Sequence, residues 1–369
     1  MSETAYAIAL SRLEGVSLAT ALQLYRRCGS AQAVFALKAP LPDMTERAGR
    51  NLMAALASSH KALARADAEL EFCERKGIRA IAFNDPDYPA LLRACDDAPL
   101  VLFYLGTADL NQQHIVSVVG TRRITEYGKD LCRTFCRDLA RLLPDALVVS
   151  GLAYGVDVHV HRACLEHGLQ TVGVLAHGLD RIYPALHRTT AKQMVHQGGL
   201  LTEYLTQTQP KPENFVRRNR IVAGIAAATV VVESAAKGGA LITARLAQDY
   251  NRSVFAFPGR AADQYSQGCN ALIRDNTAGL IASAEDFLSM MGWQEKQQKP
   301  VQRELFPELS EQESLICRLI AQDERKQLNQ IAVESELPVA TVTSLLFDLE
   351  LKGLVRPLPG GRYLLNIDD

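Results

Sequence analysis

The middle of the chain alternates short apolar runs with amphipathic stretches. Six runs are almost wholly apolar, which is typical of strands that are buried on both faces of a parallel sheet. They are residues 115–119, 146–149, 171–175, 199–202, 228–232 and 253–256. Helical periodicity fills the intervals at 129–143, 159–167, 186–197 and 241–250. This alternation predicts an α/β domain with a doubly wound, mostly parallel sheet over residues 81–291.

Two smaller regions flank this domain. Residues 1–80 have the spacing of short packed helices joined by glycine turns, which is typical of a SAM-like or helix-hairpin-helix domain. Such turns can bind phosphate, but Gly15-Val16-Ser17 is weaker than the usual Gly-x-Gly turn, so a structural or partner-binding role is favoured. Residues 292–309 are polar and aperiodic, as in a linker. Three helices and a Gly-Gly hairpin over 310–369 predict a winged helix.

Composition narrows the class of protein. Hydrophobic residues make up 48% and charged residues 22%, as in globular chains. The formal net charge of −1 means that any phosphate-binding surface must be local. Eight cysteines without a CxxC pair indicate a reducing cytoplasm and no metal site, and no cofactor is expected. The N-terminus is unlike a signal peptide, and no apolar run could cross a membrane. We therefore expect a cytoplasmic protein without membrane contact.

Three predicted strand ends carry glycine beside hydroxyl or basic side chains. They supply Gly120, Thr121, Arg122 and Arg123, then Ser150, Gly151 and Gly155 before the helix N-cap candidate Asp157, and lastly Gly238 and Gly239. Glycine lets the backbone approach a ligand closely, free amides donate to phosphate, and arginine offers a bidentate fork. Because parallel strands end at one edge of a sheet, these loops predict a continuous anion-binding groove.

A basic segment with one aromatic ring precedes the fifth predicted strand. It contains Lys211, Phe215, Arg217, Arg218 and Arg220. In proteins that bind single-stranded nucleic acid, cations contact the phosphates and aromatic rings stack on the bases. A solvated basic turn with the phenylalanine in the core fits the same composition, so both interpretations stay open at this point.

Catalytic patterns are weak. The chain has no Ser-His-Asp order and no HExxH sequence. Glu203 and Glu233 lie near strand ends and could do acid–base work, but structural roles are favoured. His159 and His161 are two residues apart without a nearby acidic cluster, so polar contacts are favoured over metal ligation.

Eight motifs follow one another in the order of the DprA/Smf family. They are GTRR, SGLAYGVDVHVHRACL, LAHGLDRIYP, GGLLTEY, FVRRNRIVAG, VVVESAAKGGALITARLA, VFAFPG and GCNALI, across about residues 88–288. The chain therefore resembles this family. The resemblance implies an extended Rossmann fold that binds single-stranded DNA, a homodimer, and no enzymatic activity. It also implies that the protein protects incoming strands and helps to load RecA recombinase in natural transformation.

The resemblance also implies particular contacts. Phosphate contacts fall on Gly120, Thr121 and Arg122, and the loop Ser150-Gly151 to Asp157 is accompanied by His161. Further DNA contacts fall on Phe215, Arg218, Asn219 and Arg220, with Lys211 loosely placed before them. Two departures stand out, namely Val216 where the family has proline, and Gly238-Gly239-Ala240 where it has Ser-Gly-Ser. Fewer hydroxyl–phosphate contacts are therefore expected at the last loop.

Two alternatives remain. A phosphoribohydrolase-like nucleotide enzyme would use Glu203 or Glu233, although the PGGxGT run of such enzymes is absent. A ligand-responsive transcription factor would need a DNA-reading winged helix. The candidate recognition helix, residues 338–353, carries Asp348 and Glu350 but only Lys352 as a base. Major-groove readers usually present basic or amide side chains, so this winged helix is predicted to contact protein instead of duplex DNA.

Overall fold

The computed structural model describes residues 1–42, 44–293, 309–321, 326–358 and 361–365. They belong to two compact units, Met1–Gln294 and Glu295–Asp369. Most of the predicted linker, residues 294–308, lies outside the described residues. No helix within the described ranges combines the length and the apolar character that are needed to cross a bilayer.

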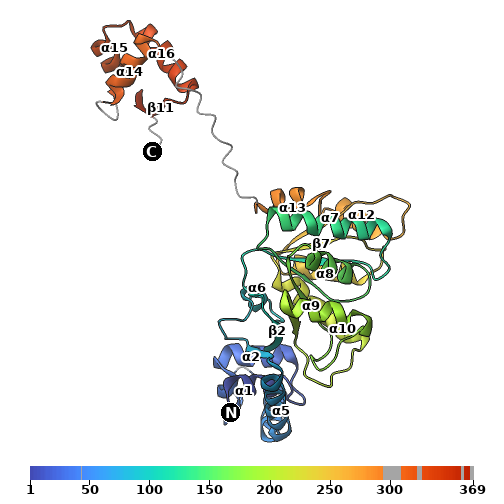
Figure 1. Ribbon diagram of the computed structural model, residues 1–369. Helices are drawn as coiled ribbons and strands as arrows, with labels where there is room; N and C mark the ends of the chain where they lie inside the picture. The colour runs from blue at the N-terminus through green and yellow to red at the C-terminus, as the bar shows by residue number, and fades with distance from the viewer. Residues whose placement is uncertain (43, 294–308, 322–325, 359–360, 366–369) are drawn as a thin grey trace. The chain divides into compact units, whose positions relative to one another are not determined.

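A nine-stranded sheet organises the first unit (Figure 1). Its strands are β1 (Arg79–Ala82), β2 (Val101–Gly106), β3 (Ile115–Val119), β4 (Leu147–Ser150), β5 (Gln170–Val174), β6 (Gly198–Thr202), β7 (Ala228–Val231), β8 (Ser253–Ala256) and β9 (Gly279–Leu280). The spatial order is β1-β2-β6-β5-β4-β3-β7-β8-β9. Strands β3 to β9 run parallel, whereas β2 is antiparallel to β6 and β1 to β2. The predicted fold class is thus confirmed.

The order of the strands contains one switch point. From β3 the chain proceeds outward through β4, β5 and β6, and it then returns to place β7 on the other side of β3. Strands β3, β4 and β7 are buried along their whole length, as their apolar composition predicts. In doubly wound sheets a ligand binds beyond the carboxyl ends of the strands at such a switch point. Here that position lies between β3 and β7.

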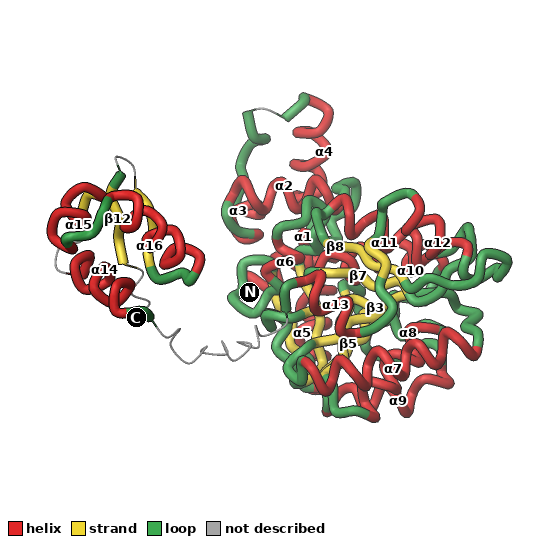
Figure 2. Tube along the Cα trace, turned by 90° about the horizontal axis from the view of Figure 1, so that it is seen from above, coloured by secondary structure: helices red, strands yellow, loops and turns green. Residues whose placement is uncertain are grey.

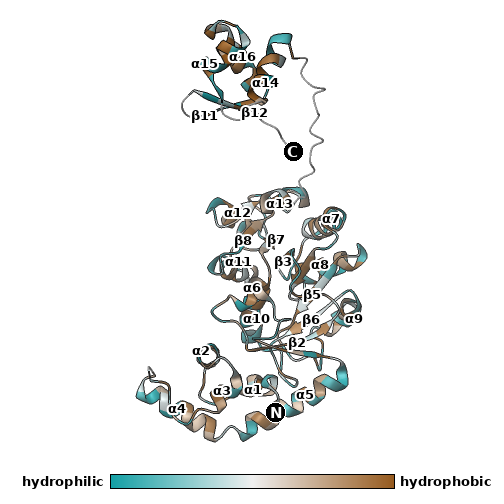
Figure 3. Ribbon diagram, turned by 90° about the vertical axis from the view of Figure 1, so that its left-hand side faces the viewer, coloured by the Kyte–Doolittle hydropathy of each residue, from teal (hydrophilic) through white to brown (hydrophobic). Residues whose placement is uncertain are grey.

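Helices cover both faces of this sheet (Figure 3). One face carries α7 (Glu126–Leu142), α8 (Val156–Glu166) and α9 (Arg188–His196), and the other carries α10 (Pro212–Ile225), α11 (Gly239–Asp249) and α12 (Gln267–Arg274). Helix α13 (Ala284–Met291) packs on α7. In α7 the buried positions Cys132, Phe135, Cys136 and Leu139 follow helical spacing, so its thiols belong to the core.

The N-terminal helices pack beside β1 and β2. They are α1 (Glu3–Leu10), α2 (Leu18–Cys28), α3 (Ala31–Phe35), α4 (Glu46–Ala57) and α5 (His60–Lys76), and a short α6 (Ala90–Arg93) follows β1. Ile8 and Tyr25 from these helices share one hydrophobic core with Phe83 and Leu102 of the sheet region. The boundary predicted between residues 80 and 81 falls within β1, and both segments belong to one compact unit.

The second unit is a winged helix, as predicted (Figure 2). Its elements are α14 (Glu311–Ala321), β10 (Lys326–Gln327), α15 (Leu328–Ser335), α16 (Val339–Leu351), β11 (Val355–Leu358) and β12 (Arg362–Leu365). The strands pair in the order β10-β12-β11. Its core contains Ile316, Ile331, Val342 and Leu346. The opposite side of α16 exposes Phe347 and Leu351, at 59% and 72% of their surface.

Candidate nucleic-acid interface

A groove of about 460 Å³ opens at the switch point between β3 and β7. Five segments form its walls: the loop after β3, the loop into α8, one side of α10, the loop from β7 into α11, and the loop after β8. These segments bring together most of the predicted contact residues, namely Gly120, Thr121, Arg122, Arg123, Asp157, Phe215, Arg218, Asn219, Gly238 and Gly239. The loops of three parallel strands therefore meet at one edge, as their sequence positions predict.

Arg122 and Phe215 form the central contact of the groove. The Arg122 guanidinium carbon lies 5.1 Å from the centroid of the Phe215 ring. Arg122 is exposed, whereas Phe215 is partly buried and also packs against Tyr183, with ring centroids 5.9 Å apart. A cation over an aromatic face is mutually stabilised, and it places a phosphate-binding group next to a surface on which a base can stack.

The N-terminus of α11 forms another part of the groove wall. Gly238 is the N-cap and Gly239 the first residue of this 11-residue helix, and both are exposed. Free amides and the helix dipole attract anions at such a terminus. Lys237, which the sequence reasoning missed, is exposed beside them and also lines the groove. A lysine directly ahead of a double glycine at a strand end was the signal that could have found it.

Two glycines, Gly151 and Gly155, let the segments that form the groove pack closely against one another. Gly155 has φ +78°, and a Cβ there would lie 2.1 Å from the Thr121 carbonyl oxygen. Val156 N–H donates to the same oxygen at 3.1 Å, which joins the loop after β4 to the loop after β3. A Cβ on Gly151 would lie 2.4 Å from a guanidinium nitrogen of Arg218. These glycines therefore allow close packing of the groove's walls.

Arg218 is a structural cation in the wall of the groove. Only 3% of its surface is exposed, and Nη1 donates to the carbonyl oxygens of Gly151, at 2.6 Å, and Val174. Burial lowers the pKa of Arg218. Burial raises the pKa of Asp157, although the neighbouring Arg218 acts in the opposite direction. Asp157 accepts from the Ala153 N–H at 3.3 Å. This network ties α10 to the ends of β4 and β5.

Two further predicted residues lie beneath the groove. Ser150 is fully buried, and its hydroxyl donates to the Val118 carbonyl oxygen at 2.6 Å. The Nδ1 atom of His161 lies 2.7 Å from the Thr171 hydroxyl. Burial, and next the charge of Arg218, lower the pKa of His161 to about 3. The Ser150 side chain therefore ties the end of β4 to β3, and the His161 side chain ties α8 to the first residues of β5.

The basic segment is helical, and its side chains therefore point to different sides of the helix. Residues 212–225 form α10, in which successive side chains turn by about 100°. Phe215, Arg218 and Asn219 consequently line the groove. Arg220 instead donates to Glu203 Oε2 at 2.5 Å and to the Asp97 carbonyl oxygen at 2.6 Å, outside the groove. Exposed Lys211, the N-cap residue of α10, also lies outside the groove lining.

Both candidate catalytic carboxylates are engaged in structural contacts. Glu233 is buried and accepts from the Thr125 N–H at 2.9 Å and the Thr125 hydroxyl at 2.5 Å. Glu203 pairs with Arg220. Among the described residues that line the groove, Asp157 is the only acid. Within the same described ranges, no group of three or more His, Cys, Asp or Glu side chains could hold a metal ion.

The fold and the groove together define a class: a doubly wound α/β protein with a groove at the carboxyl ends of its strands and an appended winged helix. The model of the family DNA recombination-mediator protein A matches residues 79–292, and that of the DprA winged helix domain matches residues 302–361. The chain belongs to the DNA recombination-mediator protein A family, to which the name DprA/Smf also refers.

Three relatives show how far the similarity extends. Protein Smf of Synechocystis sp. is 34% identical over 80% of this chain and 82% of its own length. The crystal structure of DNA processing protein A from Streptococcus pneumoniae is 28% identical with a TM-score of 0.65, over 78% of this chain and 98% of that one. A Helicobacter pylori DNA processing protein A, described for its single-stranded DNA binding mode, is 28% identical with a TM-score of 0.53, over 58% and 96%.

Proposed function

We propose that the groove binds the sugar–phosphate backbone of single-stranded DNA. The observation that carries this proposal is the placement of Arg122 over Phe215 at the switch point of the sheet, in a groove that the N-terminus of α11 also lines. The H. pylori relative, which binds single-stranded DNA, supports it. Phosphates lie along the loop after β3 and the α11 N-terminus, where Lys237 adds charge, and a base stacks on Phe215.

This arrangement favours single strands of any sequence. An aromatic face accepts every base, and backbone amides and cations recognise phosphates without reading base edges. A duplex keeps its bases stacked inside, so it cannot offer one to Phe215. Arg218 is buried in the wall of the groove, where its charge adds positive potential. The groove can therefore attract phosphates although the formal net charge of the chain is −1.

We further propose that the protein acts as a mediator and catalyses no reaction. Glu203 and Glu233, the carboxylates that an enzyme would need, are already held by Arg220 and Thr125. In this role the protein protects incoming strands and helps to load RecA recombinase during natural transformation, working as a homodimer. The winged helix contacts protein, since its α16 exposes Phe347 and Leu351 beside Asp348 and Glu350.

The first test is fluorescence anisotropy of a labelled single strand of about 30 nucleotides at several salt concentrations, with an equally long duplex as competitor. The proposal expects tight, sequence-indifferent, salt-sensitive binding that the duplex does not displace. Absent binding, or equal affinity for the duplex, would contradict it. Release of free base from nucleoside monophosphates would instead support the phosphoribohydrolase alternative.

A further inference from the structure

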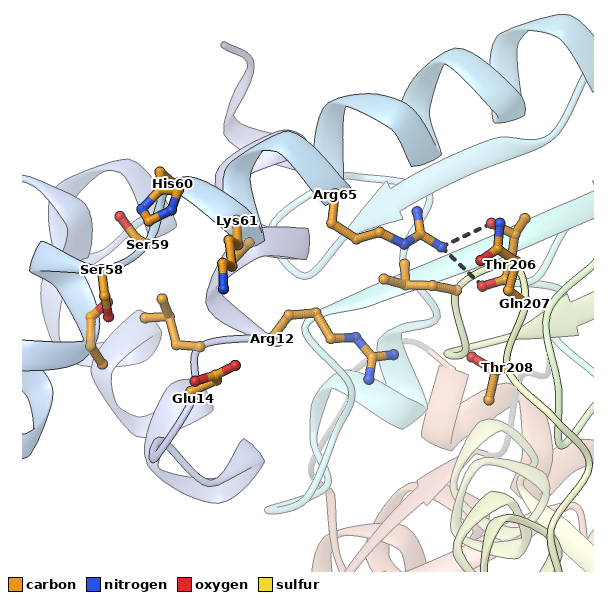
Figure 4. A pocket seen from close by; sticks show the side chains of 14 residues that line it. Arg12, Glu14, Ser58, Ser59, His60, Lys61, Arg65, Thr206, Gln207 and Thr208 are labelled. Atoms are coloured by element: carbon orange, nitrogen blue, oxygen red, sulfur yellow. Dashed lines mark hydrogen bonds between the residues drawn. The ribbon is translucent and has the colours of Figure 1, made fainter.

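A second cavity, of about 490 Å³, lies where the N-terminal helices meet the sheet (Figure 4). Three segments surround it: the turn between α1 and α2, the junction of α4 and α5, and the loop after β6. Figure 4 shows Arg12 reaching from the first segment towards the loop that contains Thr206 and Thr208, with Lys61 and Arg65 on the side of α5.

The lining of this cavity is cationic. Arg12, Lys61 and Arg65 face it, together with His60, whereas Glu14 is its only acid among the described residues. Arg65 is already bound to Glu69 at 2.7 Å and to the Thr206 hydroxyl at 2.9 Å. The side chains of Arg12 and Lys61 make no hydrogen bond or ion pair with any residue that the structure describes. Two cations are therefore available to an anion.

The surroundings of the two cations favour an anionic ligand. Partial burial lowers the pKa of Arg12, whereas the carboxylate of Glu203 raises it. The nearby guanidiniums of Arg217 and Arg65 also lower this pKa, because they repel the charge of Arg12. An added anion would relieve this like-charge repulsion. Lys61 lies in the first turn of α5, a 17-residue helix whose N-cap, Ser59, makes no side-chain capping bond. The dipole of α5 thus adds to the positive potential of the cavity.

The cavity lies on the same edge of the sheet as the groove. The loop that contains Thr206 follows the carboxyl end of β6, and three strand spacings, about 14 Å, separate β6 from β3. Helix α10 stands between the two sites. Its Phe215 side lines the groove, while Arg217 on its other side shares a small hollow with Arg12. Arg217, which pairs with Glu203 in this hollow, therefore lies between the cations of the groove and those of the cavity.

We infer that this cavity is a second phosphate-binding site, which holds a backbone phosphate of the same single strand that occupies the groove. The inference rests on the proposed function. Arg12 and Lys61 bind the phosphate, and Arg65, fixed by Glu69, supports the positive wall. Strands long enough to pass α10 reach the cavity, and short strands fill the groove alone. The N-terminal helices thereby lengthen the binding path.

The test uses the full chain with Arg12→Gln and Lys61→Gln combined. A matched control, Arg75→Gln with Lys76→Gln, removes the same two charges at the other end of α5, about 22 Å away. Anisotropy is measured with oligothymidylates of about 6 and about 30 nucleotides across a salt series. Circular dichroism and thermal unfolding check that all variants fold alike.

We expect the cavity variant to bind the long strand several-fold more weakly, with a salt slope reduced by about 0.7 for the one lost phosphate contact, and to bind the short strand as the parent does. The control should match the parent on both strands. Unchanged binding of the long strand would overturn the inference and leave the proposed function standing. Equal weakening on both strands would also overturn it, because the cavity would then act through the groove. A parent that binds neither strand refutes the proposed function itself.

Discussion

Arg122 and Arg218 were both predicted as DNA contacts, and the structure gives them opposite environments. Arg122 is exposed in the loop after β3 and lies over Phe215. Arg218 is buried in α10 and donates to the carbonyl oxygens of Gly151 and Val174. One cation is free to hold a ligand, and the other holds the wall against which that ligand would lie. Both residues are arginines that line the same groove, so the exposure of the side chain decides which role each one has.

The largest expected effect concerns the buried arginine. Arg218→Met removes the guanidinium hydrogen bonds to Gly151, Val174 and Asn219 and leaves Asp157 as an uncompensated buried acid, so the free energy of unfolding should fall by about 3–5 kcal/mol. Urea unfolding followed by circular dichroism measures this loss. Arg217→Met, an exposed change one position earlier, is the control and should stay within about 0.5 kcal/mol. A stable Arg218 variant that merely binds DNA less well would break the comparison and make Arg218 a direct contact.

The aromatic partner of Arg122 comes next. Phe215→Ala should weaken binding of single-stranded DNA by about 1–3 kcal/mol if the ring stacks on a base. Val216→Ala, which removes an exposed apolar side chain from the same wall, is the matched control. Titration by anisotropy at fixed salt measures both variants. Unchanged affinity together with a lowered melting temperature would assign Phe215 to packing against Tyr183.

Strand periodicity and loop chemistry were enough to predict the groove, because both are local properties of the sequence. The six predicted strands exist with ends shifted by no more than one residue, and their loops converge since parallel strands share one edge. The phase of α10 was not predictable in this way. Without knowing that residues 212–225 are helical, Arg218 and Arg220 could not be assigned to different sides. Strands β1, β2 and β9 were missed, and β2 reaches its place only through antiparallel pairing with β6.

Burial also hid the roles of single side chains. Ser150 lies at a strand end and precedes a glycine, as a phosphate-binding serine would. Its hydroxyl nevertheless donates to the carbonyl oxygen of Val118 in the neighbouring strand β3. Whether a hydroxyl points to solvent or to the neighbouring strand depends on strand register, which the sequence does not state. Lys237 was overlooked for the converse reason, since a single lysine gains meaning only when the fold places it in the same groove as Arg122.

The buried layer under the groove should make the fold sensitive to acid. The folded-state pKa of His161 is about 3, against about 6.5 when unfolded, so the unfolded chain binds more protons between these values. Stability contributed by neutral His161 is present above pH 6.5 and is lost as the pH falls, by at most about 1.4 kcal/mol per pH unit. Burial lowers the pKa of His177 and His187 in the same direction.

Urea unfolding at several pH values between about 7 and 5 measures this effect. His161→Asn retains a polar group near the Thr171 hydroxyl and cannot titrate, so its stability should depend less steeply on pH. His60→Asn, at an exposed histidine of α5, should keep the parental slope. Equal slopes in all three proteins would mean that His161 binds protons equally in the folded and unfolded states, and the proposed contrast between a buried layer and an open groove would weaken.

The smallest expected effect belongs to the exposed arginine. Arg122→Ala removes one phosphate contact, so the slope of log affinity against log salt should decrease by about 0.7 for a single strand, whatever its sequence. Its free energy of unfolding should stay within about 0.5 kcal/mol of the parent, since the side chain is exposed. Arg245→Ala, at an exposed arginine of α11 outside the groove lining, controls for the loss of one charge. An unaltered slope would show that Arg122 only positions Phe215 and binds no phosphate. Arg122 and Arg218 would then both have structural roles, although one is exposed and the other is buried.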